Sequence, residues 1–75
     1  MQNDNLRAIL AANVRDYRTQ EGLSQDEFAA KCGLHRTYIG SVERSERNVT
    51  LATLELLSKA TGLSVTKLLT EGGSK

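Results

Sequence analysis

Hydrophobic residues recur along the chain at helical spacing, in short segments separated by polar caps and glycines. In the first segment, Leu6, Leu10, Val14 and Tyr17 follow one another at intervals of four, four and three residues. This is the period of a helix with one apolar face. Gly22 follows the segment, and a glycine just past the last periodic residue is typical of a helix end. The pattern predicts a first helix that serves mainly as scaffold.

Two shorter helices are predicted between Ser24 and Arg44, joined by a tight turn at Gly33. Ser24 and Glu27 have the spacing of a capping box, which fixes where a helix begins. Gly33 suits the turn because a residue without Cβ readily adopts the left-handed conformation that ends a helix. Residues 24–44 therefore indicate a helix-turn-helix.

Two further helices are expected after residue 49. Thr50 and Ser64 each precede an apolar segment, and both are residue types that favour helix N-caps. Gly62 would end the first of these helices, and residues 72–75 would form a frayed tail. The predicted core face of that helix consists of Leu51, Leu54 and Leu57. Together the segments predict a compact all-α fold of five helices.

The composition agrees with one small helical domain spanning residues 1–75. The hydrophobic fraction is 39%, with only two tyrosines and one phenylalanine, which favours a Leu/Ala/Val helical core over a β-sandwich. A core of this size is marginal, so a partner subunit would help. No apolar run is long enough to span a membrane and no signal segment is present, so no membrane association is expected and the location is predicted to be cytoplasmic.

Catalysis and metal binding find no support in the sequence. Cys32 is the only cysteine, and we expect it to be a buried small hydrophobe. No Cys/His ligand spacing exists, and the single histidine has no nucleophile or carboxylate arranged around it in a known order. The chain is therefore predicted to be no enzyme and to need neither metal nor cofactor.

Nucleic-acid binding is indicated by the distribution of charge more than by its total. The net charge is only +1, from ten basic and nine acidic residues, yet Arg36, Arg44 and Arg47 fall within a dozen residues. In the second helix of the pair, Ile39 and Val42 occupy one side. The opposite side carries three small residues followed by an arginine: Thr37, Gly40, Ser41 and Arg44. Such a face suits insertion into a DNA groove. Gly40 fits either a close approach to DNA or a tolerated surface position.

The run GLHRTYIGSVERSERNVTLATLELL, residues 33–57, resembles the controller proteins of bacterial restriction-modification systems, within the XRE or Cro-repressor class of helix-turn-helix regulators. The match is carried by Arg36, Thr37, Tyr38, Ile39, Glu43, Arg44, Arg47, Asn48, Thr50, Leu54 and Glu55. The resemblance implies a lambda-repressor-like fold and a homodimer that binds palindromic operator DNA. It also implies control of the chain's own gene and of a restriction enzyme's gene, with activation at low occupancy and repression at high occupancy, and it allows a contact with RNA polymerase.

The resemblance also assigns roles to individual residues. Side chains facing DNA bases would be Arg36, Thr37, Ser41 and Arg44. Side chains on the DNA backbone would be Gln25, Tyr38, Arg47 and Asn48, and His35 would either touch a phosphate or be an exposed turn residue. Gln25 begins a capped helix, where free amides and the helix dipole favour a phosphate. In this class, an arginine at the position of Arg18 pairs with the glutamate at the position of Glu43.

A homodimer interface is predicted on the side of the fourth helix opposite its leucine face. Ala52, Leu56 and Ala60 line up there at i, i+4 and i+8, and Val65 and Leu69 of the last helix would adjoin them. A single exposed leucine is also ordinary on a surface. The competing function is a protein-interaction module, antitoxin-like or bridging, and Arg36 with Thr37 argues against it.

Overall fold

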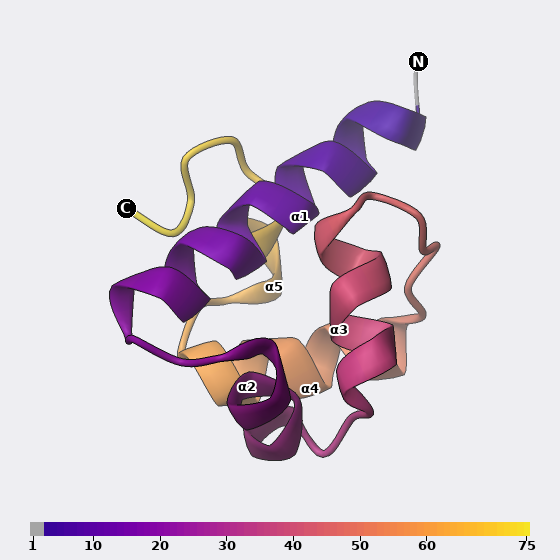
Figure 1. Cartoon of the computed structure of the whole chain (residues 1–75). Coiled ribbons are helices and arrows are strands. Elements are labelled where there is room, and N and C mark those ends of the chain that lie inside the picture. Colours follow the sequence, from indigo (N-terminus) through magenta and orange to yellow (C-terminus); the bar gives the residue numbers. More distant parts are fainter. Residues whose placement is uncertain (1–2) are drawn as a thin grey trace.

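The computed structural model describes residues 3–75, and within this range all regular structure is helical (Figure 1). The five helices are α1 (Asn3–Gln20), α2 (Gln25–Cys32), α3 (Arg36–Glu43), α4 (Leu51–Thr61) and α5 (Val65–Leu68). The predicted all-α fold of five helices is therefore confirmed. None of the helices in the described range has the length and apolar character needed to cross a membrane.

The predicted caps set the helix boundaries. Ser24 Oγ accepts a hydrogen bond from the amide of Glu27 at 3.0 Å, and Glu27 Oε1 accepts one from the amide of Ser24 at 2.8 Å. This reciprocal pair is a capping box, and it starts α2 at the predicted residue. Gly33 has φ of 74° and ends α2 in the left-handed conformation. Thr50 and Ser64 cap α4 and α5 in the same way as Ser24, each through its side-chain oxygen.

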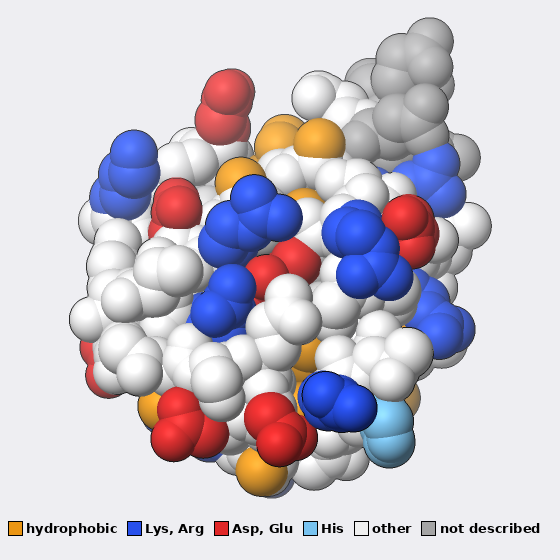
Figure 2. All heavy atoms as spheres, in the orientation of Figure 1, with side chains coloured by type: hydrophobic (Ala, Val, Ile, Leu, Met, Phe, Trp, Pro, Cys, Tyr) orange, Lys and Arg blue, Asp and Glu red, His pale blue; other side chains and the backbone are white. Residues whose placement is uncertain are grey.

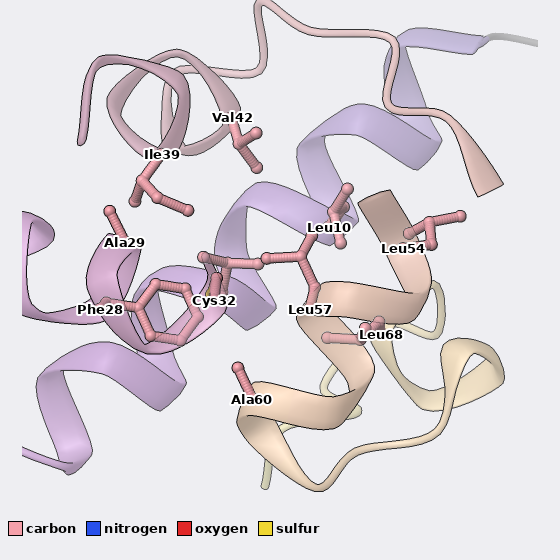
Figure 3. Close-up of a cluster of buried hydrophobic side chains, with 11 residues drawn as sticks. Leu10, Phe28, Ala29, Cys32, Ile39, Val42, Leu54, Leu57, Ala60 and Leu68 are labelled. Atoms are coloured by element: carbon pink, nitrogen blue, oxygen red, sulfur yellow. The ribbon is translucent and has the colours of Figure 1, made fainter. Parts of the chain in front are cut away.

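The core lies where all five helices meet, and every helix contributes to it. Phe28 of α2 is fully buried, and its ring centre lies 5.8 Å from that of Tyr17 on α1. Figure 3 shows the surrounding side chains pointing inward from the other helices. The buried cluster consists of Leu10, Val14, Phe28, Ala29, Cys32, Ile39, Val42, Leu54, Leu57, Ala60 and Leu68. The predicted buried state of Cys32 is thus confirmed.

The core face of α4 differs from the prediction at both of its ends. Leu51 was expected in the core but is 79% exposed, whereas Ala60 was expected in the dimer interface but is only 9% exposed. Leu51 is the first residue of α4, directly after the N-cap Thr50. Ala60 lies beside Cys32 and Gly33 at the end of α2, where a small side chain lets the two helices approach. The periodic pattern gave the correct phase only for Leu54 and Leu57.

The chain end folds back onto α1 instead of fraying. Asn13, which is 1% exposed, donates from Nδ2 to the carbonyl oxygens of Leu68 and Thr70, each at 2.8 Å. The same amide lies 3.2 Å from the carbonyl oxygen of Lys67, and Asn13 Oδ1 accepts from the amide of Ser74 at 3.3 Å. In Figure 1 the yellow C-terminal segment accordingly runs beside α1. The expectation of a frayed tail at residues 72–75 is corrected, because one buried side chain supplies the partners that the backbone needs.

Candidate nucleic-acid interface

The N-terminus of α3 is shaped by His35. Its backbone is extended, with φ of −79° and ψ of 145°, and its Nδ1 accepts a hydrogen bond from the amide of Thr37 at 3.1 Å. An imidazole nitrogen thus takes the place of the hydroxyl or carboxylate oxygen that usually caps a helix. Only the other ring nitrogen remains for the phosphate contact predicted for His35.

Arg36 and Thr37 occupy the first turn of α3, and both are exposed. Within residues 3–75, the Arg36 guanidinium and the Thr37 hydroxyl have no hydrogen-bond or ion-pair partner. A guanidinium in this position can donate two parallel hydrogen bonds to guanine O6 and N7, and a threonine offers a hydroxyl and a methyl group. The two residues have the exposure and the position that reading base edges requires.

Farther along α3, the face predicted to be open is covered. Gly40 is buried, and a Cβ added there would lie 3.1 Å from Arg44 Nη1 and 3.5 Å from Gln25 Oε1. The glycine therefore makes room for two side chains of this protein. The predicted alternative of a tolerated surface glycine is therefore wrong, whereas a close approach to DNA stays a prediction. Of the predicted outward face, only Thr37 and Arg44 are exposed.

Ser41 lies under Arg47, and its hydroxyl is used within the protein. The side chain donates from Oγ to the carbonyl oxygen of Tyr38 at 2.7 Å and accepts from Arg47 Nε at 3.0 Å. Ser41 is 8% exposed. These two bonds use the hydroxyl's only proton and one of its two acceptor sites, so Ser41 could donate to a base only by breaking the bond to Tyr38, and base reading by Ser41 stays a prediction.

Arg47 is held in place from two sides. Its guanidinium carbon lies 4.5 Å from the centre of the Tyr38 ring, in addition to the hydrogen bond to Ser41. Stacking on the ring and the bond from Nε leave the terminal nitrogens directed away from Ser41. An arginine in a loop is normally mobile, whereas this one is fixed against α3 before any DNA arrives.

Glu43 ties the far end of α3 to α1 and α2. The Arg18 guanidinium donates from Nε to Oε2 at 2.6 Å and from Nη2 to Oε1 at 3.0 Å, so the predicted Arg18–Glu43 pair is present and bidentate. Gln25 Nε2 donates to Oε1 at 3.1 Å. Arg15 donates from Nη2 to the backbone oxygen of Glu43 at 3.2 Å, and its Nε lies 3.8 Å from Oε1. One buried carboxylate therefore fixes the orientation of the recognition helix.

The charge state of Glu43 follows from these neighbours. Burial raises the pKa of a carboxyl, but here the hydrogen bonds from Arg18 and Gln25, together with the charges of Arg18 and Arg15, outweigh burial and lower the pKa below its ordinary value. The hydrogen bond to Glu43 also raises the pKa of Arg18, although burial opposes this. The pair remains ionised at neutral pH.

Two more of the predicted backbone contacts lie near this network. Gln25 is exposed at the first residue of α2, where the backbone amides of the helix start face outward. Asn48 is exposed in the loop after α3, and its Oδ1 accepts from Arg7 Nη1 at 2.9 Å. The Asn48 amide nitrogen remains as a donor. Arg44 is largely exposed, with Nε 3.2 Å from Glu46 Oε2.

Basic side chains gather on the face that α1, α2 and α3 share. Figure 2 shows Lys and Arg side chains spread over this face around a central acidic group, with further acidic side chains toward its lower edge. The arginines of α1, of α3 with its C-cap, and of the loop after α3 are Arg15, Arg18, Arg36, Arg44 and Arg47. A convex, positively charged surface of this kind suits the phosphate backbone on either side of a DNA groove.

Sequence reasoning missed Arg15 and Asn13. Arg15 precedes Arg18 by three residues, which places both on one face of α1, so helical spacing could have associated it with the ion pair. Asn13 stands next to Val14 in the apolar segment, and a polar residue there signals a buried hydrogen-bonding role. Its backbone partners near residues 67–74 could not have been deduced from spacing.

The residues predicted for the dimer interface differ in their exposure, and their part in an interface stays a prediction. Ala52 is exposed, Leu56 is 39% exposed, and Ala60 belongs to the core. Leu56 lines a shallow hollow that also contains Lys31 and Lys59. Val65 and Leu69 are half-buried on or beside α5, and Leu69 borders a different groove. Of the predicted stripe only Ala60 is corrected, because it lies mostly in the core, although it borders the same hollow as Leu56.

Within the described residues, no group of three or more His, Cys, Asp or Glu side chains is arranged to hold a metal ion. Burial raises the pKa of the Cys32 thiol to about 11, so this side chain is neutral at physiological pH.

Comparisons with known proteins identify relatives across nearly the whole chain. The family described as helix-turn-helix (HTH_3) matches residues 14–68. The control protein C.SmaI of Serratia marcescens is 61% identical over 70 residues, which cover 93% of this chain and 83% of that protein.

Two solved structures are similar as well. The hypothetical transcription factor NHTF from Neisseria has a TM-score of 0.85 at 41% identity, covering 93% of this chain and 79% of that one. The restriction-modification controller protein C.Esp1396I, solved as a tetramer with its natural 35 base-pair operator, has a TM-score of 0.77 at 32% identity, covering 93% of this chain and 96% of that one. The helix pair, the capped recognition helix and these similarities lead to one conclusion: the chain belongs to the XRE-type helix-turn-helix family, HTH_3, and resembles the restriction-modification controller proteins within it.

Proposed function

We propose that this chain is a sequence-specific transcriptional regulator that binds palindromic operator DNA as a homodimer and acts as a restriction-modification controller. One observation carries the proposal: Arg36 and Thr37 are exposed on the first turn of α3, while Glu43 fixes the other end of that helix to α1 and α2. A recognition helix held at one end and open at the other can enter a major groove with its first residues on base edges.

We assign the side chains to base contacts, to DNA-backbone contacts and to contacts that hold other side chains in place. Arg36 and Thr37 read bases, and Arg44 reaches the groove from the C-cap of α3. Gln25, Tyr38, Arg47 and Asn48 set the register of the protein on the phosphate backbone. Ser41, Gly40 and Glu43 act inside the protein, where they hold Arg47, Arg44 and the helix itself in place.

The test uses duplexes that the parent protein selects from a random pool. Arg36→Ala should cost about 1 to 3 kcal/mol on a selected duplex, flatten the preference at one base position and change random-duplex binding far less. Arg36→Lys is the matched control, because it keeps the charge but cannot donate two parallel hydrogen bonds to one guanine. It should retain random binding and still lose the base preference.

Two results would count against the proposal. Equal losses on selected and random duplexes would make Arg36 a phosphate contact. A parent protein that prefers no duplex over random DNA, even at low salt, would remove the regulator function and leave the protein-interaction module.

The expected targets follow from the controller resemblance. They include the chain's own gene and a restriction enzyme's gene, with activation at low occupancy and repression at high occupancy. A reporter driven by the selected operator should therefore rise and then fall as the protein level increases. A steady fall would leave a simple repressor, and the contact with RNA polymerase stays a prediction.

A further inference from the structure

Among the arginines of α3, its C-cap and the following loop, only Arg44 is paired with a carboxylate in the described part of the chain. Its Nε lies 3.2 Å from Glu46 Oε2, and each of the two side chains is more than half exposed. Arg36 has no ion-pair partner within residues 3–75, and Arg47 is held by a ring and a hydroxyl, which carry no charge. The charge of Arg44 is therefore balanced locally, whereas those of Arg36 and Arg47 are not.

The backbone after α3 holds Glu46 beside Arg44. Ser45 has φ of 63°, the left-handed conformation in which helices commonly end and which glycine usually supplies. The amide of Ser45 donates to the carbonyl oxygen of Val42 at 3.0 Å. The amide of Glu46 donates to the carbonyl oxygen of Ser41 at 2.9 Å. These two bonds close the end of α3, so the Glu46 side chain starts from a fixed point on the helix end.

The guanidinium of Arg44 is also limited on its other side. A Cβ at Gly40 would lie 3.1 Å from Arg44 Nη1, so the group lies over the one position of α3 that has no side chain. Glu46 beside Nε and Gly40 beneath Nη1 keep the guanidinium against the helix. The terminal nitrogens, Nη1 and Nη2, retain donors for another group.

We infer that Glu46 is a specificity-determining residue of the DNA interface: its carboxylate withholds the charge of Arg44 from the phosphate backbone and leaves the terminal nitrogens of that arginine for a base. The inference rests on the proposed function, because it concerns the choice between operator and random DNA.

A phosphate that approaches Arg44 also approaches the Glu46 carboxylate. The repulsion between the two anions offsets the attraction to the guanidinium, so the pair as a whole adds little to binding of the DNA backbone. An arginine without this partner would strengthen binding to every duplex, including those that are not operators. Glu46 therefore lowers the affinity for random DNA.

A guanine makes a different demand on Arg44. Its O6 and N7 accept two parallel hydrogen bonds, which Nη1 and Nη2 can donate together while Nε stays beside Glu46. Because the carboxylate already restrains the arginine, less conformational freedom is lost when the guanine is bound. The same ion pair thus weakens binding to phosphate and favours binding to a base, and specificity is the difference between the two.

Binding of the full chain to a selected duplex and to a random duplex, measured over a range of salt concentrations, tests the inference. Glu46→Gln keeps the size of the side chain and removes its charge. It should raise the affinity for the random duplex by about threefold or more at low salt and steepen the slope of log affinity against log salt by about one unit. The ratio of selected to random affinity should fall by a similar factor. Glu55→Gln is the matched control, because it changes the net charge equally at an exposed residue of α4, and it should leave the ratio unchanged.

Arg44→Ala assigns the effect to the ion pair. On the random duplex it should reduce affinity by less than about twofold in the parent and by about threefold or more in the Glu46→Gln background, because only there is the guanidinium available to phosphates. On the selected duplex Arg44→Ala in the parent should lose at least about fivefold, as expected for one guanine contact. Glu46→Gln should hardly change the melting temperature, since an exposed ion pair contributes little to stability.

Four outcomes would overturn the inference: equal gains on selected and random duplexes in Glu46→Gln, the same fall of the ratio in Glu55→Gln, an effect of Arg44→Ala on random DNA that is equal in both backgrounds, and full retention of selected-duplex affinity by Arg44→Ala. A parent that prefers no duplex would overturn the proposed function, and this inference with it. A parent that prefers its selected duplex but shows no coupling between Glu46 and Arg44 would overturn the inference alone.

Discussion

The guanidinium carbon of Arg47 lies 4.5 Å from the centre of the Tyr38 ring, while its Nε donates to Ser41 Oγ at 3.0 Å. A side chain from the loop is thus docked on the recognition helix. Freezing an arginine on binding DNA costs conformational entropy, and a side chain that is already fixed loses less. We therefore propose that Tyr38 acts on DNA through Arg47, in addition to the direct backbone contact predicted for it.

Arg47→Ala should weaken binding to all duplexes alike and reduce the slope of log affinity against log salt by about one unit. Tyr38→Ala should remove part of the same energy, whereas Tyr38→Phe keeps the ring and serves as its control. In a double-mutant cycle on a random duplex, Arg47 and Tyr38 should couple by roughly 0.5 to 1 kcal/mol. An unchanged salt slope in Arg47→Ala would place this side chain away from phosphate.

Gly40→Ala should change thermal stability and operator binding in opposite directions. Alanine favours a helix interior over glycine by up to about 1 kcal/mol, and the new methyl group would press mainly on Arg44 Nη1, the far end of a flexible side chain. We therefore expect a higher melting temperature together with weaker operator binding, because Arg44 and Gln25 must move from their places. Thermal unfolding and operator titration on the same sample measure both effects. A variant that binds as the parent does would show that Arg44 has no required position.

Glu43→Gln should lower the free energy of unfolding at pH 7 by about 1.5 to 3 kcal/mol, since charged hydrogen bonds become neutral ones. The pKa of Glu43 is lower in the folded chain than in the unfolded chain. Its contribution is therefore complete above the ordinary carboxyl pKa of 4.5 and is lost as the pH falls through the lower folded value. Urea unfolding at pH 7 and at pH 3 should show a smaller difference between parent and variant at pH 3. A constant difference would assign the loss to packing.

The local signals in the sequence predicted the helices because each boundary depends on neighbouring residues. Ser24, Thr50 and Ser64 act within three positions of themselves, so spacing alone identified them. The Arg18–Glu43 pair required the family resemblance, since its members are 25 residues apart.

The remaining features depend on which surfaces meet. Ser41 and Gly40 have the composition of an open face, and only the positions of Arg47, Arg44 and Gln25 cover them. The burial of Leu51 and Ala60 was predicted wrongly, because the pattern of a leucine-rich helix gives its period but not which of its side chains pack against another helix. Which of these residues are buried depends on contacts between segments that are far apart in the sequence. The spacing of residues within one helix does not predict those contacts.

The C-terminal segment is attached to α1 mainly through the side chain of Asn13, so a substitution at this residue tests how much that attachment stabilises the fold. Asn13 Nδ2 donates to carbonyl oxygens at the end of α5, and a Cβ added at Gly73 would collide with the backbone carbonyl of Lys67. Asn13→Asp keeps the shape but replaces the donor with a buried carboxylate facing carbonyl oxygens. It should lower the free energy of unfolding at pH 7 by about 3 kcal/mol or more.

Asp16→Asn is the control for this change, because its only contact with the chain end is a long one of 3.5 Å from Ser74 Oγ to Asp16 Oδ2. Urea unfolding of the two variants should differ clearly, and Asn13→Asp within about 1 kcal/mol of the parent would mean that water replaces the amide.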